Sequence, residues 1–147
     1  MKLRKTLYVL LRVVMAFIVL WAFFDKLLGL GRTTPAAKAW IHGGSPTSGF
    51  LMSLHGTFAP LFNSLAGIAI IDWLFMIGLL VIGLALLFNR YMKLAAIAGA
   101  ILFALMFLAE FPPANNPLFD EHIVYILVLL ILGFTHHRGI SKNTPAK

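Results

Sequence analysis

Four long apolar runs, separated by polar or turn-rich stretches, dominate the pattern of this chain. They cover about residues 7–30, 65–88, 92–111 and 121–135. An α-helix rises about 1.5 Å per residue, so roughly 20 apolar residues cross a hydrocarbon core of about 30 Å. The first three runs are long enough, and the fourth is long enough only if Asp120 and His136 lie at the two interfaces. We therefore predict an all-α protein, an integral membrane four-helix bundle.

The bundle is expected to form a single domain over residues 1–140, followed by a disordered cytoplasmic tail over 141–147. The segment between the first two runs, about residues 36–63, is too apolar for a simple linker. Its large apolar residues include Trp40, Ile41, Phe50, Leu51, Phe58 and Phe62, interrupted by Gly43, Gly44 and Pro46. We expect an interfacial or re-entrant element over the outer helix ends, with a short helix starting near Thr47 or Ser48. A floppy loop is the alternative.

Composition agrees with a lipid environment. The chain has 147 residues, of which 61% are hydrophobic and 12% charged. In an average soluble domain about half of the residues are hydrophobic and about a quarter are charged. A single domain of this size cannot bury so much apolar surface, so we expect the lipid bilayer to be its partner. The net charge of +7 then marks loops that flank a membrane rather than a nucleic-acid surface. The absence of cysteine excludes disulfides and thiolate chemistry.

The basic residues predict the orientation. Three regions that share one side of a four-span bundle hold most of them: Lys2, Arg4 and Lys5; Arg90 and Lys93; Arg138, Lys142 and Lys147. The positive-inside rule places these regions, and both termini, in the cytoplasm. We therefore expect a multi-pass protein of a prokaryotic plasma membrane. A signal peptide is the alternative for the first run, but that run exceeds a signal core of roughly 7–15 residues.

All five carboxylates then fall on the outer side: Asp25, Asp72, Glu110, Asp120 and Glu121. Asp72 is the most informative, because it lies one to two turns inside its run, and intramembrane carboxylates mark a functional site or a buried ion pair. Both interpretations stay open, with Lys26 or Arg32 as the ion-pair partner. Asp120 and Glu121 begin a helix, where they suit a capping role. Glu110 ends a helix, where its charge has the wrong sign for the dipole.

The histidines favour no metal or haem site. None has the i, i+4 spacing of a helix-borne site, and no HExxH motif occurs. His122 is the one credible buried histidine, and the adjacent His136 and His137 suit a basic tail. No phosphate-binding or flavin motif is evident either, so we expect neither a metal nor a flavin.

Several stretches together resemble the DoxX superfamily of four-helix membrane proteins. They are Leu11-Arg12, WAFFDKLL (21–28), WIHGGSPTSGFL (40–51), DWLFMIGLL (72–80) with Gly83, and NPLFDEHIVY (116–125). These segments touch every predicted helix and are most similar to the DoxD-like branch, the membrane subunit of thiosulfate:quinone oxidoreductase. The GGSPTSGFL and NPLFDEHIVY segments are the more specific ones.

The resemblance implies that two thiosulfates couple to tetrathionate while a quinone, as co-substrate, takes two electrons. It also implies a small DoxA-like partner subunit. The residues are compatible with this chemistry. Asp72, Glu110 and His122 are candidate catalytic residues that could deliver protons to a quinone. The candidate substrate-binding residues are Lys26, Arg32 and Asp25, and Lys38 could also attract the thiosulfate dianion.

Two other function classes remain open. The chain could be a non-catalytic scaffold or assembly partner in a membrane redox or sulfur-stress complex, with the outer charges forming ion pairs that fix the helix order. It could also be a transporter or channel component, although the inner half lacks a polar path. A homo-oligomer is compatible with each class.

Overall fold

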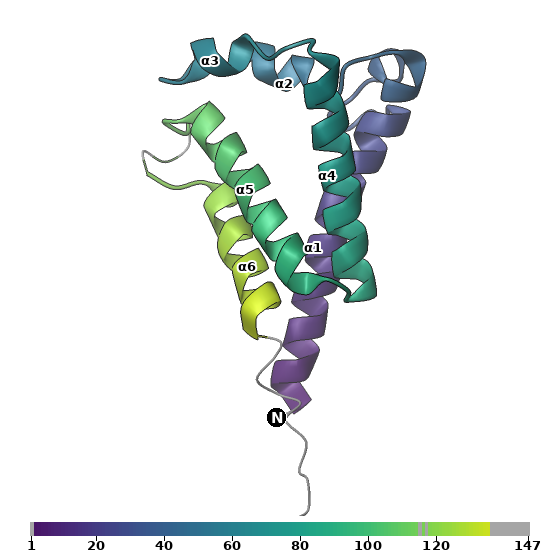
Figure 1. The fold of residues 1–147 in the computed structure, drawn as a ribbon, viewed down its shortest axis with the longest axis vertical. Helices are drawn as coiled ribbons and strands as arrows, with labels where there is room; N and C mark the ends of the chain where they lie inside the picture. The colour runs from purple at the N-terminus through teal and green to yellow at the C-terminus, as the bar shows by residue number, and fades with distance from the viewer. Residues whose placement is uncertain (1, 115, 117, 136–147) are drawn as a thin grey trace, which may run out of the picture.

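The computed structural model describes residues 2–114, 116 and 118–135, and their regular elements are all helical (Figure 1). The four longest are α1 (Lys2–Leu28), α4 (Ala69–Phe88), α5 (Met92–Glu110) and α6 (Glu121–Thr135). Between α1 and α4 lie the short helices η1 (Ala36–Lys38), η2 (Trp40–His42), α2 (Ser48–Met52) and α3 (Ala59–Asn63). The all-α prediction is therefore confirmed for this part of the chain.

Three of the described helices, α1, α4 and α5, are long and apolar enough to cross a membrane. Helix α6 is apolar but has 15 residues, so the fourth span stays a prediction, and both His136 and the 141–147 tail lie outside the described residues. Helix α4 begins later than its apolar run because Gly67 adopts a φ of +78°, which interrupts the helix before Ala69.

The long helices form two closely packed pairs, α1 with α4 and α5 with α6. Glycines allow the close approach. A Cβ on Gly83 of α4 would lie 2.6 Å from the Leu20 side chain, and one on Gly99 of α5 would lie 2.6 Å from that of Leu129. Small residues at such contacts are typical of helices that pack in lipid.

The two pairs share a core that extends from the turn between α4 and α5 along the helices toward the opposite end of the molecule. It is built from residues such as Met15, Val19, Met76, Ile82, Leu86, Leu129 and Leu132. Large apolar side chains on the opposite helix faces are exposed, among them Val14, Phe17, Leu74, Ile77, Val81, Leu94 and Ile101. An apolar surface of this extent is unfavourable in water and suits contact with lipid.

Polar contacts join the helices at the end of the molecule where α4 is connected to α5. Arg12 of α1 donates from Nη1 to the carbonyl oxygen of Leu87 at 2.8 Å and also to that of Leu86. The Tyr8 hydroxyl donates to the carbonyl oxygen of Leu132 at 2.7 Å. Arg12 therefore satisfies carbonyl groups at the C-terminal end of α4, where a cation also suits the helix dipole.

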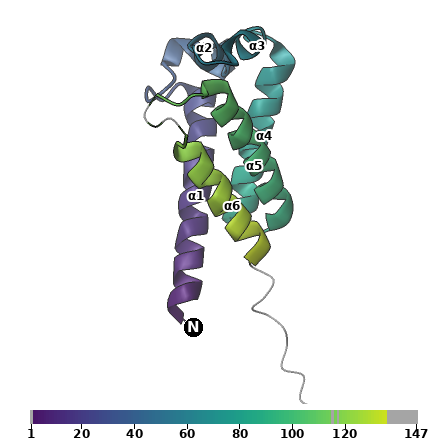
Figure 2. The same cartoon turned by 90° about the vertical axis from the view of Figure 1, so that its left-hand side faces the viewer.

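At the opposite end, α4 and α5 diverge, and α2 and α3 run across their ends (Figures 1 and 2). This 45–68 segment is packed rather than loose. Leu51, Leu54, Ala59 and Phe62 form a second apolar cluster with Ala109 of α5. The backbone N–H of Thr57 donates to the carbonyl oxygen of Phe111 at 2.9 Å. The position of α2 and α3 agrees with an element that covers the helix ends.

Candidate functional site

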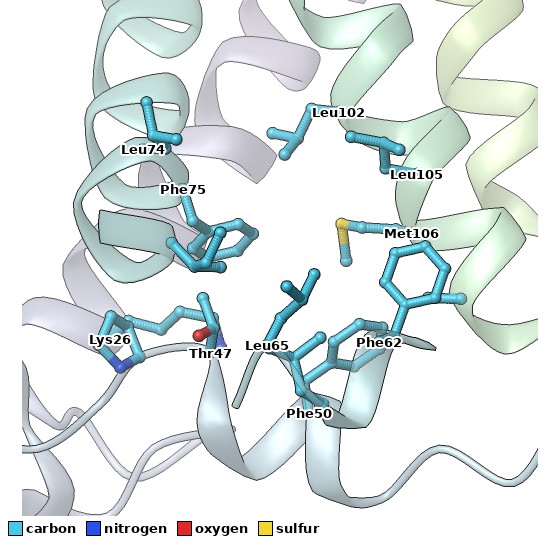
Figure 3. Close-up of a pocket in the computed structure, with 14 residues that line it drawn as sticks. Lys26, Thr47, Phe50, Phe62, Leu65, Leu74, Phe75, Leu102, Leu105 and Met106 are labelled. Atoms are coloured by element: carbon cyan, nitrogen blue, oxygen red, sulfur yellow. The ribbon is translucent and has the colours of Figure 1, made fainter. Parts of the chain in front are cut away.

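A cavity of about 300 Å³ lies where α4 and α5 diverge, beneath α2 and α3 (Figure 3). Its walls include Phe50 and Phe62 from the covering segment, Phe75 from α4, and Leu102 and Met106 from α5. Of its lining residues, only Lys26 and Thr47 are not apolar, and Figure 3 shows them on the same side of the cavity. The cavity thus combines an apolar body with a small polar end.

Lys26, in the last turn of α1, is the one charged residue that lines this cavity. It is half-buried, and its Nζ lies 6.0 Å from the centroid of the Phe75 ring. Within the described part of the chain, Lys26 has no carboxylate within 4.0 Å. A cation held over an aromatic ring and facing an apolar cavity favours a ligand with a hydrogen-bond acceptor or a negative charge.

Asp72 is buried in the first turn of α4, with 6% of its surface exposed. Its Oδ1 accepts hydrogen bonds from the Ser45 hydroxyl at 2.9 Å, the Thr47 hydroxyl at 2.6 Å and the Thr47 backbone N–H at 3.1 Å. The Ser48 hydroxyl and backbone N–H contact the Ser45 hydroxyl in turn. Asp72 therefore fixes the 45–48 loop and orients Thr47 beside the cavity.

The ion pair that was one of the two interpretations of Asp72 does not form. Among the described residues, neither Lys26 nor Arg32 lies within 4.0 Å of its carboxylate. Neutral donors replace the cation, because two hydroxyls and an amide can stabilise a buried carboxylate without a second buried charge. The interpretation of Asp72 as the ion-pair partner of Lys26 or Arg32 is therefore wrong.

Asp25 is the most buried carboxylate of the described chain, with 1% of its surface exposed. Its Oδ1 accepts from the Arg32 backbone N–H at 3.1 Å, and its Oδ2 accepts from the Thr33 backbone N–H at 3.0 Å and from the Thr33 hydroxyl at 2.6 Å. The carboxylate thus holds the loop that follows α1. The side chains of Arg32 and Lys38 are exposed, so they are accessible to an anion arriving from that side.

Glu110, Asp120 and His122 form a second polar group, between the end of α5 and the start of α6. Asp120 accepts from the His122 backbone N–H at 2.9 Å through Oδ1, and its Oδ2 lies 2.7 Å from Nδ1 of the His122 ring. Glu110 Oε2 lies 4.0 Å from the same Nδ1. Asp120 thus satisfies a free N–H in the first turn of α6, which confirms its predicted capping role.

The three candidate catalytic residues divide between these places. Glu110 and His122 lie together, whereas the hydrogen bonds of Asp72 go to Ser45 and Thr47, and neither Glu110 nor His122 lines the cavity. Sequence reasoning singled out neither of the two hydroxyl residues as a site residue. The available signal was the hydroxyl-rich Gly-Gly-Ser-Pro-Thr-Ser stretch (43–48), since a carboxylate inside an apolar helix needs donors from elsewhere.

No protein-family profile, curated protein or solved structure matches this chain. The resemblance to the DoxX superfamily therefore stays a prediction from the segments quoted above.

Proposed function

We propose that this chain is a DoxX-type membrane protein that binds a quinone between α4 and α5, as the membrane subunit of a thiosulfate:quinone oxidoreductase. The observation that supports it most is the apolar cavity of about 300 Å³ with Lys26 and Thr47 on one side. Small-molecule sites are concave and mostly apolar, with a few polar groups that fix orientation. A quinone has this character, because its carbonyl oxygens accept hydrogen bonds and the rest of the molecule is apolar.

The two polar side chains suit the two states of a quinone. The ammonium group of Lys26 can only donate, so it favours a carbonyl oxygen and stabilises negative charge that develops there on reduction. The Thr47 hydroxyl donates its proton to Asp72 at 2.6 Å, so its lone pairs remain to accept from a quinol hydroxyl. Lys26 therefore stabilises the quinone as it is reduced. Thr47, oriented by Asp72, accepts a hydrogen bond from the quinol.

The proposed reaction couples the oxidation of thiosulfate to the reduction of a quinone. Two thiosulfate ions join through a new sulfur–sulfur bond, giving tetrathionate and releasing two electrons. The quinone takes up these electrons and two protons and becomes a quinol. Arg32 and Lys38 are exposed and suit the attraction of the thiosulfate dianion. Since the chain has no cysteine, the electrons pass directly between the substrates or through the small DoxA-like partner.

The proposal includes a topology. Helices α1, α4, α5 and α6 cross a prokaryotic plasma membrane, with both termini in the cytoplasm and α2 and α3 on the outer side. Helix α1 begins at the end of the molecule opposite to α2 and α3 (Figure 1), and the basic residues Lys2, Arg4 and Lys5 begin the chain there. This distribution agrees with the positive-inside rule.

An assembly scaffold is the second candidate, and one observation favours it. The buried carboxylates Asp25 and Asp72 accept hydrogen bonds from donors of their own chain, and both hold loops in place. Carboxylates that hold loops in place fix the surface of the protein, and a partner could recognise that surface. The two functions differ in whether the cavity must hold a quinone.

The test is thiosulfate-dependent reduction of a short-chain quinone by the detergent-purified chain, alone and with its partner subunit. We expect turnover that falls at least about tenfold in Lys26→Met, because a lost charge-assisted interaction costs about 1.4 kcal/mol or more. Lys5→Met is the matched control and should keep its turnover, since Lys5 is exposed near the start of the same helix and does not line the cavity. No turnover and no quinone binding, even with the partner present, would favour the scaffold.

A further inference from the structure

We propose that Glu110, Asp120 and His122 form a binding site for a divalent transition-metal ion such as Zn²⁺, at the junction of α5 and α6. The site is separate from the cavity, since none of the three residues lines it, and the inference does not rest on the proposed function. One imidazole nitrogen and two carboxylates are a donor set that Zn²⁺ accepts, and three protein ligands leave a coordination position for water.

The donor atoms already converge. One ligand atom from each of the three residues lies within 4.8 Å of the others. Ligand atoms around a tetrahedral Zn²⁺ lie about 3.3–3.6 Å apart, because each is about 2.0–2.2 Å from the metal. The Asp120 Oδ2 to His122 Nδ1 distance of 2.7 Å must therefore widen, and the 4.0 Å from Glu110 Oε2 to Nδ1 must shorten. The Glu110 side chain, which is 38% exposed, has room to make this movement.

His122 is held in position for a ligand. Its side chain is more than nine-tenths buried, at 8% exposed. Its ring lies 6.0 Å from that of Phe103, and its backbone N–H is bonded to Asp120. The ring therefore directs Nδ1 toward both carboxylates. Coordination through Nδ1 requires the neutral tautomer of the ring that carries its proton on Nε2.

The charge around Glu110 independently indicates a cation. Glu110 ends α5, where the helix dipole is negative, and Asp120 and Glu121 follow across the connecting loop. Glu110 accepts no hydrogen bond, and no Lys or Arg lies within 4.0 Å of Glu110 or Asp120, in the part of the chain that is described. Asp25 and Asp72, in contrast, are satisfied by several donors. A carboxylate at the negative end of a helix, with two more carboxylates nearby, is unfavourable unless a cation neutralises the charge.

A purely structural role is the alternative. Asp120 caps α6 and orients His122 without any ion, so those two contacts alone do not require a metal. Glu110 separates the two explanations, because the cap does not need it, whereas the metal site does.

The experiment is calorimetric titration of the detergent-purified, chelator-treated chain with Zn²⁺, supported by the visible absorption of bound Co²⁺. We expect one saturable site per chain, with affinity lowered at least about tenfold by Glu110→Gln. Asp120→Asn should also weaken binding while it preserves the cap, since Asn caps helices as well as Asp does. Glu121→Gln is the matched control, an exposed carboxylate beside His122 that should retain the affinity.

The adjacent His136 and His137 could bind Zn²⁺ by themselves, so the double variant H136Q/H137Q is required as well and should retain the site. Four results would overturn the proposal. The first two are the absence of saturable binding and an unchanged affinity in Glu110→Gln. The third is an equal loss in Glu121→Gln, which would indicate diffuse attraction, and the fourth is the disappearance of binding in the double histidine variant. Thermal unfolding without metal confirms that each variant is folded.

Discussion

The hydroxyl of Thr47 lies 2.6 Å from Oδ1 of Asp72, which joins the covering segment to the first turn of α4 beside the cavity. Thr47 is the residue immediately before α2, so this bond fixes where the short helix begins. The same carboxylate oxygen also accepts from Ser45. One side chain of a long helix thus determines the conformation of a loop about 25 residues before it.

Removing the Asp72 carboxylate should loosen the covering segment. Asp72→Ala leaves the Thr47 backbone N–H and two hydroxyls without their acceptor, and we expect the free energy of unfolding to fall by about 2 kcal/mol. Asp72→Asn retains an acceptor oxygen and should cost less, but more than the tail substitution Lys142→Gln. Thermal unfolding in detergent and quinone reduction are the measurements. Equal tolerance of Asp72→Asn and Lys142→Gln would contradict a site in the outer half.

The Thr47 side chain should contribute to catalysis through its hydroxyl group and not only through its shape. Thr47→Val keeps the shape of the side chain but removes the hydroxyl, so it should lower quinone turnover by about tenfold, which corresponds to one hydrogen bond in the transition state. Thr47→Ser keeps the hydroxyl and should retain most of the activity. Steady-state kinetics with a soluble quinone distinguishes the two. Loss of activity in both variants would instead indicate a packing role.

Two glycines of α4 should respond differently to the same substitution. Gly83 faces Leu20, where a Cβ would lie 2.6 Å from side-chain atoms, whereas a Cβ on Gly78 has no atom within 4 Å. Gly83→Leu should separate α1 from α4 and lower stability by about 2–3 kcal/mol. Gly78→Leu should be tolerated. The comparison is made by thermal unfolding in one detergent, and similar losses would show that the α1–α4 contact differs from the one described.

Arg12 should stabilise the end of α4. Arg12→Leu removes the donor to the carbonyl oxygens of Leu86 and Leu87, and we expect a loss of about 1–2 kcal/mol. Arg4→Leu, at an exposed position of the same helix, is the control and should change stability little. If both variants unfold at the temperature of the unmodified chain, the carbonyl contacts contribute nothing measurable.

The absence of cysteine allows a direct test of topology. Single cysteines at Ser53, beside α2, and at Lys93, in the first turn of α5, are both at exposed positions. A membrane-impermeant maleimide added to intact cells should label Ser53→Cys, and it should label Lys93→Cys only after lysis. This result follows if the covering segment faces outward and the α4–α5 turn faces the cytoplasm. The reverse pattern would invert the proposed orientation.

The long helices were predictable because run length and hydropathy are local properties of the sequence. The predicted runs 92–111 and 121–135 nearly coincide with α5 and α6. The contacts of Asp72 were not predictable, because a period of apolar residues gives no information about which distant hydroxyls will meet a carboxylate. Asp120 lies two residues from His122, and its role in capping was foreseen from helix position alone.

The cavity was beyond sequence reasoning for a different reason. In a membrane protein the side chains that line an apolar cavity, such as Leu74 and Leu102, are of the same kind as those that face lipid. Only the divergence of α4 and α5 shows which of them enclose a space. Lys26 was recognised as a substrate-binding candidate, but its place over Phe75 depends on helix rotation, which the sequence pattern did not determine.

The two helix pairs are connected at one end and diverge at the other, so their separation at the cavity depends on the angle between them. Helices α4 and α5 have 20 and 19 residues, and they are connected by a turn in which Asn89 and Tyr91 both adopt left-handed backbone conformations, with φ of 56° and 54°. A small rotation at this turn becomes a large change in separation about 30 Å away. The width of the cavity is therefore set in part by residues that do not line it, and a substitution such as Asn89→Gly, at the opposite end of α4, should change the affinity of the cavity for a ligand.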